Sequence, residues 1–232
     1  MPITTVGLDA DDTLWHNETL FRLTQDRFLD LLTDHDTEAV KARLAEVERR
    51  NLRLYGYGVK GFTLSMIETA MEMCAGEPPA GAIREILAAG REMLAHPVET
   101  LPGVDEVLAR LSERYRLVLV TKGDLLDQER KLAASGLGEL FAAVEIVSEK
   151  DRTTYDRVFA RHGTGAAEAV MAGNSMRSDV LPALEAGAFA VHIPYAITWA
   201  HELADAPDDH PRYGALDRID DLPDWIDRRS DG

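Results

Sequence analysis

The sequence has a single cysteine, Cys74, few aromatic residues and no long hydrophobic run. One cysteine cannot form a disulfide within the chain, which favours a reducing compartment. No stretch approaches the roughly 20 consecutive apolar residues that cross a membrane. The first residues, MPITTVGLDADD, have neither the basic start nor the apolar core of a signal peptide. We therefore expect a cytoplasmic protein that does not bind membranes.

Basic residues are also scarce relative to acidic ones. The 232 residues include 25 Lys and Arg against 41 Asp and Glu, which gives a net charge of −16. This balance disfavours broad binding to nucleic acid or to an anionic membrane, because both need a cationic surface. A small phosphorylated ligand is still compatible, since one metal ion and a few lysines reverse the field locally. We expect a monomer or a homodimer with a small-molecule substrate and no nucleic-acid partner.

Short β-rich runs alternate with helical patterns over most of the chain. The runs lack a clear alternation of apolar and polar positions, which is typical of parallel strands covered on both faces. Alternation of strands and helices predicts a doubly wound parallel α/β sheet, here with about five strands. The expected strands lie at 3–8, 115–120, 142–147, 169–173 and 188–193, and the helices near 103–113, 124–135, 152–162 and 178–186.

One long gap interrupts this alternation. Between residues 16 and 98 we find only amphipathic helical patterns, and this is far more chain than a crossover between strands requires. We therefore expect an inserted all-α subdomain at 16–98, with residues 1–15 and 99–232 forming the α/β core. Its helices are expected at 21–32, 37–54, 62–74 and 82–94, and a solvated acidic loop is expected at 205–214.

Three aspartates follow the first expected strand, in the stretch VGLDADDTLW. Carboxylates so close together repel one another and lose hydration, so they need a cation, a proton or a solvent-filled crevice. If the backbone stays extended, Asp9, Asp11 and Thr13 face one side, and Asp12 is left for a turn or a helix cap. Ligands of open α/β sheets bind at the carboxyl ends of strands. Two carboxylates converging there are suited to binding Mg²⁺, to nucleophilic and acid–base roles, or to both.

The stretch DADDTL resembles the first signature of the haloacid dehalogenase-like (HAD) hydrolases, Asp-x-Asp-x-Thr-Leu after a strand. Three further stretches resemble the other signatures in the same order. They are RLVLVTKGD at 116–124, VSEKDRTTY at 147–155 and VMAGNSMRSDVLPALEAGA at 170–188. The resemblance covers nearly the whole core. It implies a Rossmann-like HAD core with an α-helical cap inserted between the first and second signatures.

The resemblance also implies a Mg²⁺-dependent phosphatase for a small soluble phosphomonoester, of the nucleotide or sugar phosphate type. Asp9 would attack phosphorus to form an aspartyl-phosphate, and Asp11 would protonate the leaving oxygen and then activate water. Thr121, the adjacent Lys122, and Lys150 would bind the phosphate. Mg²⁺ would be held by the Asp9 carboxylate, the Asp11 backbone carbonyl and an acidic-loop side chain, and would screen the repulsion between nucleophile and phosphate.

The fourth signature departs from the family pattern. Where it usually begins Gly-Asp, this chain has Gly173-Asn174, with Asp179 five positions later. A neutral amide oxygen should hold Mg²⁺ less tightly than a carboxylate. Asn174 is one candidate for the direct ligand, with Asp179 acting behind it or through water, and Asp179 itself is the other.

Three alternative functions stay open. In a metal-independent 2-haloacid dehalogenase the aspartate attacks carbon, but the dehalogenases lack an acid at the position of Asp11 and have no alkoxide to protonate. A phosphomutase would pass the phosphoryl group to a sugar. A catalytically silent regulator that binds a phosphorylated ligand would account for Asn174. It would leave the set of Asp9, Asp11, Thr121 and Lys150 idle, and idle charges in a crevice reduce stability.

The stretch GYGVKG at 56–61 follows a charged helical pattern and not a strand, so it predicts a turn between helices and not a dinucleotide-binding loop. In HAD proteins with a helical insertion at this point, the cap closes over the core and selects the substrate. Tyr55, Tyr57 and Lys60 are therefore candidates for lining the leaving-group pocket. Substituting Tyr57 or Lys60 should change substrate preference more than metal binding. Unchanged relative rates across a substrate panel would count against this hypothesis.

Overall fold

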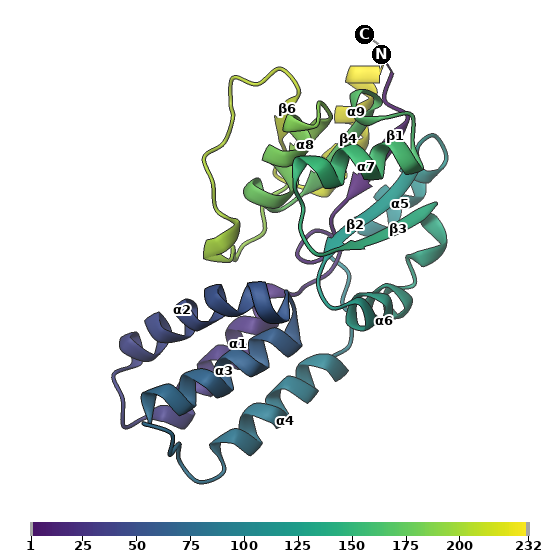
Figure 1. The fold of residues 1–232 in the computed structure, drawn as a ribbon. Coiled ribbons are helices and arrows are strands. Elements are labelled where there is room, and N and C mark those ends of the chain that lie inside the picture. The colour runs from purple at the N-terminus through teal and green to yellow at the C-terminus, as the bar shows by residue number, and fades with distance from the viewer. Residues whose placement is uncertain (1, 231–232) are drawn as a thin grey trace. The chain divides into compact units, whose positions relative to one another are not determined.

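The computed structural model describes residues 2–230, and one of its two compact units is built on a parallel sheet (Figure 1). Every strand pairing in this sheet is parallel, and the strand order is β3-β2-β1-β4-β5-β6. The strands are β1 (Thr5–Leu8), β2 (Arg116–Lys122), β3 (Ala143–Val147), β4 (Ala169–Gly173), β5 (Phe189–His192) and β6 (Tyr213–Ala215). The predicted doubly wound α/β fold is confirmed, although the sheet has six strands and not about five.

Helices cover both faces of the sheet, because successive side chains of a strand point to opposite sides. Leu119 of β2 lies in an apolar cluster with side chains of α5 and α9, whereas the next residue, Val120, lies in a cluster with α7 and α8. Both residues are fully buried, which explains why the strand sequence lacks a polar face. The helices of this unit are α5 (Val104–Ser112), α6 (Leu125–Ser135) from Gln128 onward, α7 (Arg152–His162), α8 (Leu181–Glu185) and α9 (Leu222–Ser230).

Strand β1 brings the ends of three strands together. Its last residue, Leu8, pairs with Leu119 of β2 and with Ala172 of β4. The N–H of Asp9 then donates to the Ala172 carbonyl at 3.0 Å. The strand order reverses at β1, since β2 and β3 lie on one side of it and β4, β5 and β6 on the other. This is the topological switch point at which open α/β sheets place their ligands.

The second compact unit is built from helices and comprises Thr19–Pro97 together with Gly123–Asp127. Each of its four long helices contributes to one separate apolar core, for example through Phe28, Leu44, Met66 and Ile86. The predicted all-α insertion is therefore present. Its bounds differ from the predicted 16–98, because residues 16–18 and 98 belong to the sheet unit and residues 123–127 to the helical one. The helices are α1 (Glu18–Leu29), α2 (Thr37–Tyr55), α3 (Val59–Met73) and α4 (Ala82–Ala95).

Two elements near the C-terminus differ from the sequence-based expectation. The acidic loop predicted at 205–214 is wrong at its end, where Tyr213 begins the edge strand β6 that pairs with β5. A strand of three residues is too short to show a periodic pattern. Helix α9 follows and packs Trp225 over Gly214, where an added Cβ would come within 2.4 Å of Trp225 Nε1. Gly214 therefore permits this close packing.

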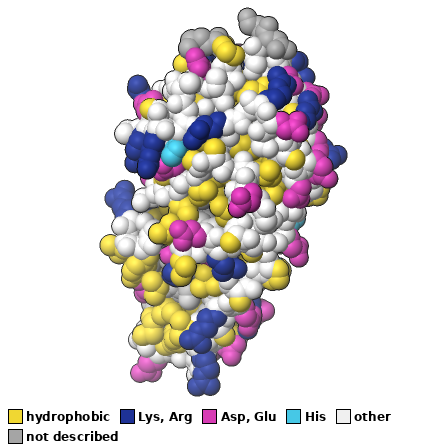
Figure 2. Space-filling view, turned by 90° about the vertical axis from the view of Figure 1, so that its right-hand side faces the viewer, with side chains coloured by type: hydrophobic (Ala, Val, Ile, Leu, Met, Phe, Trp, Pro, Cys, Tyr) yellow, Lys and Arg dark blue, Asp and Glu magenta, His cyan; other side chains and the backbone are white. Residues whose placement is uncertain are grey.

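The surface of the described residues carries charges of both signs. On the face drawn in Figure 2, Lys and Arg side chains are dispersed among Asp and Glu, with hydrophobic side chains between them. Within residues 2–230, no helix combines the length and the apolar character that a membrane crossing needs.

Candidate active site

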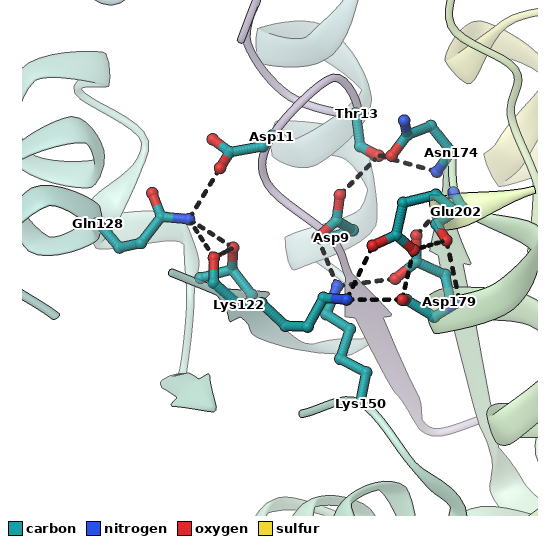
Figure 3. Close-up of polar contacts among 12 residues, drawn as sticks. Asp9, Asp11, Thr13, Lys122, Gln128, Lys150, Asn174, Asp179 and Glu202 are labelled. Carbon is teal, nitrogen blue, oxygen red and sulfur yellow. Dashed lines mark hydrogen bonds and ion pairs between the residues drawn. The ribbon is translucent and has the colours of Figure 1, made fainter. Parts of the chain in front are cut away.

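Asp9 lies directly after β1 and is buried, with 7% of its surface exposed. Lys150 Nζ contacts Asp9 Oδ1 and donates to Asp179 Oδ1 at 2.7 Å, so one ammonium group joins two carboxylates (Figure 3). Lys150 follows β3, and Asp179 lies in the short helical segment Met176–Val180 that follows β4. Residues that follow three different strands thus meet at one edge of the sheet.

This buried cluster has one cation for two anions. Burial raises the pKa of Asp9 to about 7, Lys150 opposes the increase, and Asp179 adds to it. Burial alone would lower the pKa of Lys150, but Asp179 and Asp9 raise it above its usual range. Lys150 therefore keeps its charge, and the remaining negative charge favours another cation or a proton beside Asp9.

The backbone turns after Asp9, so the extended conformation expected over residues 9–13 is wrong. The N–H of Thr13 donates to the Ala10 carbonyl at 3.2 Å, and Asp12 has a left-handed φ of 62°. The turn brings Thr13 Oγ1 back to Asp9 Oδ2 at 3.1 Å. The Asp12 carboxylate accepts from the N–H of Glu18 at 2.9 Å at the start of α1, which is the capping role expected for it.

Asp11 directs its carboxylate toward α6 and has no hydrogen bond to the Asp9 carboxylate. Its Oδ1 accepts from Trp15 Nε1 at 2.7 Å and from Lys131 Nζ at 2.6 Å, and its Oδ2 accepts from Gln128 Nε2 at 3.0 Å. The side chain is 24% exposed. Figure 3 shows Asp11 on the Gln128 side of the site, apart from the cluster of Asp9 and Lys150. The two aspartates of the motif therefore have different environments, one buried against a lysine and one held near solvent.

The two candidates for the direct metal ligand are placed differently. Thr13 Oγ1 lies 3.1 Å from Asp9 Oδ2 and 3.4 Å from Asn174 Oδ1, so one hydroxyl bridges these two oxygens. Both oxygens of Asp179 are already hydrogen-bonded, one to Lys150 and the other to the N–H of Ser175 at 2.9 Å. The side-chain oxygen of Asn174 is therefore more available to bind a metal ion than either oxygen of Asp179.

The donor set at this edge of the sheet fits Mg²⁺ in its chemistry. Among residues 2–230, no three His, Cys, Asp or Glu side chains are grouped so as to hold a metal. The predicted ligands are of a different kind, since they combine the Asp9 carboxylate with the Asn174 amide oxygen and the Asp11 backbone carbonyl. Mg²⁺ prefers oxygen donors, keeps several waters and needs only one or two carboxylates. The surplus negative charge around Asp9 is compatible with such a cation.

Thr121 and Lys122 lie at the end of β2. Thr121 is 1% exposed, and its Oγ1 accepts from Gln128 Nε2 at 2.8 Å. Lys122 Nζ donates to Glu202 Oε1 and to Ser178 Oγ, both at 2.8 Å. A phosphate bound by Lys122 would therefore share this ammonium group with an internal carboxylate.

Three residues of the site, Gln128, Lys131 and Glu202, were not predicted from the sequence. Gln128 and Lys131 lie one turn apart on α6 and are 2% and 8% exposed. Their spacing on one helix face was the available signal, but the same spacing is common on solvated helices. Glu202 lies in the connection between β5 and β6 and accepts from Ser178 Oγ at 2.5 Å and from Ser175 Oγ. No periodic pattern marks such a residue.

The three residues proposed to select the substrate lie in the helical unit. Tyr55 ends α2, and its hydroxyl donates to Glu68 Oε1 at 2.9 Å. Lys60 Nζ donates to Asp124 Oδ1 at 2.9 Å, within the same unit. Tyr57 lies between α2 and α3, although the turn expected over GYGVKG is confined to residues 56–58, because α3 begins at Val59. Their influence on substrate choice stays a prediction.

Gly173→Ala is expected to lower the free energy of unfolding by about 1–3 kcal/mol. A Cβ on Gly173 would lie 2.2 Å from Asp179 Oδ2, and Asp179 is held by Lys150 and by the N–H of Ser175. Urea denaturation measures the effect. Gly138→Ala is the matched control, because a Cβ there meets nothing closer than 3.9 Å. Equal stability of the two variants would show that Asp179 is free to move.

Glu202→Gln is expected to lower the free energy of unfolding by about 1–3 kcal/mol near neutral pH. Burial acts to raise the pKa of Glu202, but Lys122 and the hydroxyls of Ser175 and Ser178 hold it below its usual value. A carboxyl with a lowered pKa contributes stability above its unfolded-state pKa of about 4.3, and this is lost as the pH falls through the folded value. The difference between wild type and variant should therefore shrink below about pH 4. Denaturation curves across this range measure it, and a difference independent of pH would contradict the charge-based origin.

Comparison with known proteins links this geometry to one family of enzymes. A family model of haloacid dehalogenase-like hydrolases matches residues 3–187. The crystal structure of a haloacid dehalogenase-like family hydrolase from Xanthomonas campestris is 41% identical to this chain, with a TM-score of 0.89. The alignment covers 99% of this chain and 92% of the other. No curated protein matches the chain.

More distant structures share the fold. The putative HAD-hydrolase YfnB from Bacillus subtilis, bound to magnesium, is 16% identical over 97% of this chain and 99% of its own, with a TM-score of 0.68. The L-2-haloacid dehalogenase from Xanthobacter autotrophicus, with chloropropionic acid covalently bound, is 16% identical over 97% and 98%, with a TM-score of 0.65. At these identities the likeness shows the fold alone.

Proposed function

We propose that this chain, which belongs to the haloacid dehalogenase-like hydrolase family, is a phosphatase that acts on small phosphomonoesters. The observation that carries the proposal is a second carboxylate, Asp11, held by three donors two residues after the buried Asp9. Phosphomonoester hydrolysis needs a nucleophile and a group that gives a proton to the leaving oxygen. Displacement of a halide from carbon has no such oxygen. The pair of carboxylates therefore favours phosphoryl transfer.

The side chains of the site account for both halves of this reaction. Asp9 attacks phosphorus, the bond between phosphorus and the leaving oxygen breaks, and that oxygen takes the proton of Asp11. The Asp11 carboxylate then removes a proton from water as the water attacks the aspartyl-phosphate, which frees Asp9 and releases inorganic phosphate. Lys150 neutralises the nucleophile and the phosphoryl oxygens, and the hydroxyl of Thr121 donates to one of those oxygens.

The proposal includes Mg²⁺ as the metal of this site, with Asp9, Asn174 and the Asp11 carbonyl as its protein ligands. The bound ion would supply positive charge that reduces the repulsion between the anionic nucleophile and the anionic phosphate. Asn174 brings no charge, so the affinity should be lower than that of a site with a second carboxylate. The magnesium bound to YfnB belongs to that protein, and it supports the assignment here through the shared fold.

The proposed substrate is a small soluble compound, such as a nucleotide or a sugar phosphate, and not a nucleic acid. The net charge of −16 supports this choice, since one local site can attract a small anion while the surface as a whole repels a polyanion. We place the reaction in the cytoplasm, with the protein as a monomer or a homodimer.

Dehalogenation is the competing reaction, because the Xanthobacter relative is an L-2-haloacid dehalogenase. The deciding experiment measures phosphate release from an aryl phosphate and halide release from 2-chloropropionate, each with Mg²⁺ and with a chelator. We expect phosphate release that depends on Mg²⁺, and no halide. Halide release without metal would replace the proposal by dehalogenation. Neither product at high enzyme concentration would favour a ligand-binding protein without turnover.

A further inference from the structure

The carboxylate of Asp11 is fixed from three directions by side chains. Lys131 Nζ and Trp15 Nε1 lie 2.6 Å and 2.7 Å from Oδ1, and Gln128 Nε2 lies 3.0 Å from Oδ2 (Figure 3 draws the Gln128 contact). Gln128 and Lys131 both come from α6. Because both oxygens are engaged, turning the carboxylate elsewhere would break at least one charge-assisted hydrogen bond.

Lys131 is buried to a degree that lysines seldom reach, with 8% of its surface exposed. Its ammonium group contacts Asp11 Oδ1 and, at 3.0 Å, Asn17 Oδ1. A lysine on a helix ordinarily extends its charged end into water. Burying that charge reduces stability unless a partner compensates it. The partner here is the carboxylate to which the proposed reaction assigns proton transfer.

Gln128 connects Asp11 to the end of β2. Its Nε2 lies 3.0 Å from Asp11 Oδ2 and 2.8 Å from both Thr121 Oγ1 and the Lys122 carbonyl. Its other polar atom, Oε1, is buried without a hydrogen-bond partner among the described residues. An unsatisfied buried acceptor is destabilising. The Gln128 amide is therefore oriented so that its N–H groups are satisfied, although its oxygen is not. The donor side faces the acid–base residue and the proposed phosphate-binding threonine together.

We infer that Lys131 and Gln128 are positioning residues that hold Asp11 where it exchanges a proton with the leaving oxygen. This inference rests on the proposed phosphatase function. Neither residue touches the substrate, and the step is the one given above, in which the proton of Asp11 passes to the leaving oxygen as its bond to phosphorus breaks. The effect depends on the leaving group, since a basic alkoxide needs the proton and a nitrophenolate departs without it.

The test compares kcat for an alkyl phosphate with kcat for 4-nitrophenyl phosphate. In Lys131→Met and in Gln128→Leu, the ratio of alkyl to aryl kcat is expected to fall by about 10- to 100-fold, which is part of the roughly 100- to 10,000-fold that general acid catalysis contributes. KM should change by less than about twofold for both substrates. Lys131→Arg keeps a donor and should recover most of the ratio. Lys41→Met, at an exposed site on α2, is the matched control and should leave the ratio unchanged.

Asp11→Asn provides the reference, because it removes the acid itself. If it lowers the ratio while Lys131→Met and Gln128→Leu do not, the inference is overturned and the proposed function stands. If Asp11→Asn leaves the ratio unchanged, Asp11 is not the acid and the inference also fails. A wild-type protein that releases no phosphate overturns the proposed function together with the inference. A general loss of folded protein lowers the alkyl and the aryl rate alike and leaves their ratio unchanged. If Lys131→Met does not fold, the ratio measured for Gln128→Leu tests the inference.

Discussion

Lys150→Met is expected to lower the free energy of unfolding by about 3–5 kcal/mol and to abolish hydrolysis. The side chain of Lys150 is 2% exposed, and it is the cation shared by Asp9 and Asp179. Without it two buried carboxylates lie close together with nothing to compensate them, and one of them must take up a proton. The phosphate would also lose a positive charge at the nucleophile. Urea denaturation followed by circular dichroism measures the stability, and phosphate release measures the activity.

A double variant separates these two effects. Asp9→Asn combined with Lys150→Met removes one of the two uncompensated carboxylates, so it should regain part of the lost stability and none of the activity. The change in unfolding free energy of the double variant, minus the changes of the two single variants, gives the coupling energy between Asp9 and Lys150. Lys41→Met makes the same substitution at an exposed lysine and should change stability by less than about 0.5 kcal/mol. If Lys150→Met were as mild as this control, the shared-cation description would be wrong.

Asp9→Asn is expected to lower kcat by at least about 1,000-fold while leaving the fold as stable or more stable. The amide keeps the shape of Asp9 and one acceptor oxygen in place of two, but it is not a nucleophile. Burial raises the pKa of Asp9 to about 7. In the unfolded chain the pKa of this carboxyl is about 3.9, so its ionisation lowers the free energy of unfolding as the pH rises above that value. The gain in stability of the variant should therefore be larger at about pH 8 than at about pH 5. Steady-state kinetics and thermal denaturation at both pH values measure these effects.

Asp36→Asn is the control for this substitution. Asp36 is the N-cap of α2, where its carboxylate accepts from the N–H of Ala39 at 2.9 Å, and asparagine caps helices about as well. The same chemical change at that position should leave kcat unaltered. If Asp9→Asn instead lost stability together with activity, Asp9 would be a structural residue and not the nucleophile.

Most of the site residues could be predicted because each lies at or just after the end of a strand that the sequence indicates. Asp9 follows β1, Thr121 is the second-last residue of β2, Lys150 follows β3 and Asn174 follows β4. Parallel strands end at the same edge of a sheet, so their convergence follows from the strand order alone. The contact between Lys150 and Asp9 is a consequence of this topology.

The orientation of Asp11 could not be predicted in the same way. The expectation of one shared face assumed an alternating, extended backbone, whereas the N–H of Thr13 closes a turn on Ala10 and Asp12 adopts a positive φ. That turn is accompanied by a tertiary contact, in which the N–H of Asn174 donates to Thr13 Oγ1 at 3.1 Å. The partners Gln128 and Lys131 have the spacing of any polar pair on a helix face, so their burial emerges only once α6 is packed.

The central position of β1 has a consequence for the order in which the chain can fold during synthesis. Thr5 of β1 pairs with Arg116 and with Ala169, so both of its neighbours are made more than a hundred residues after it. The helices of residues 19–97 have contacts mainly among themselves and can form while the ribosome is still adding the later strands. Until β2 and β4 emerge, β1 is an apolar strand with two open edges, exposed to wrong pairing and aggregation. The segment that carries the nucleophile is thus synthesised before both of the strands that enclose it.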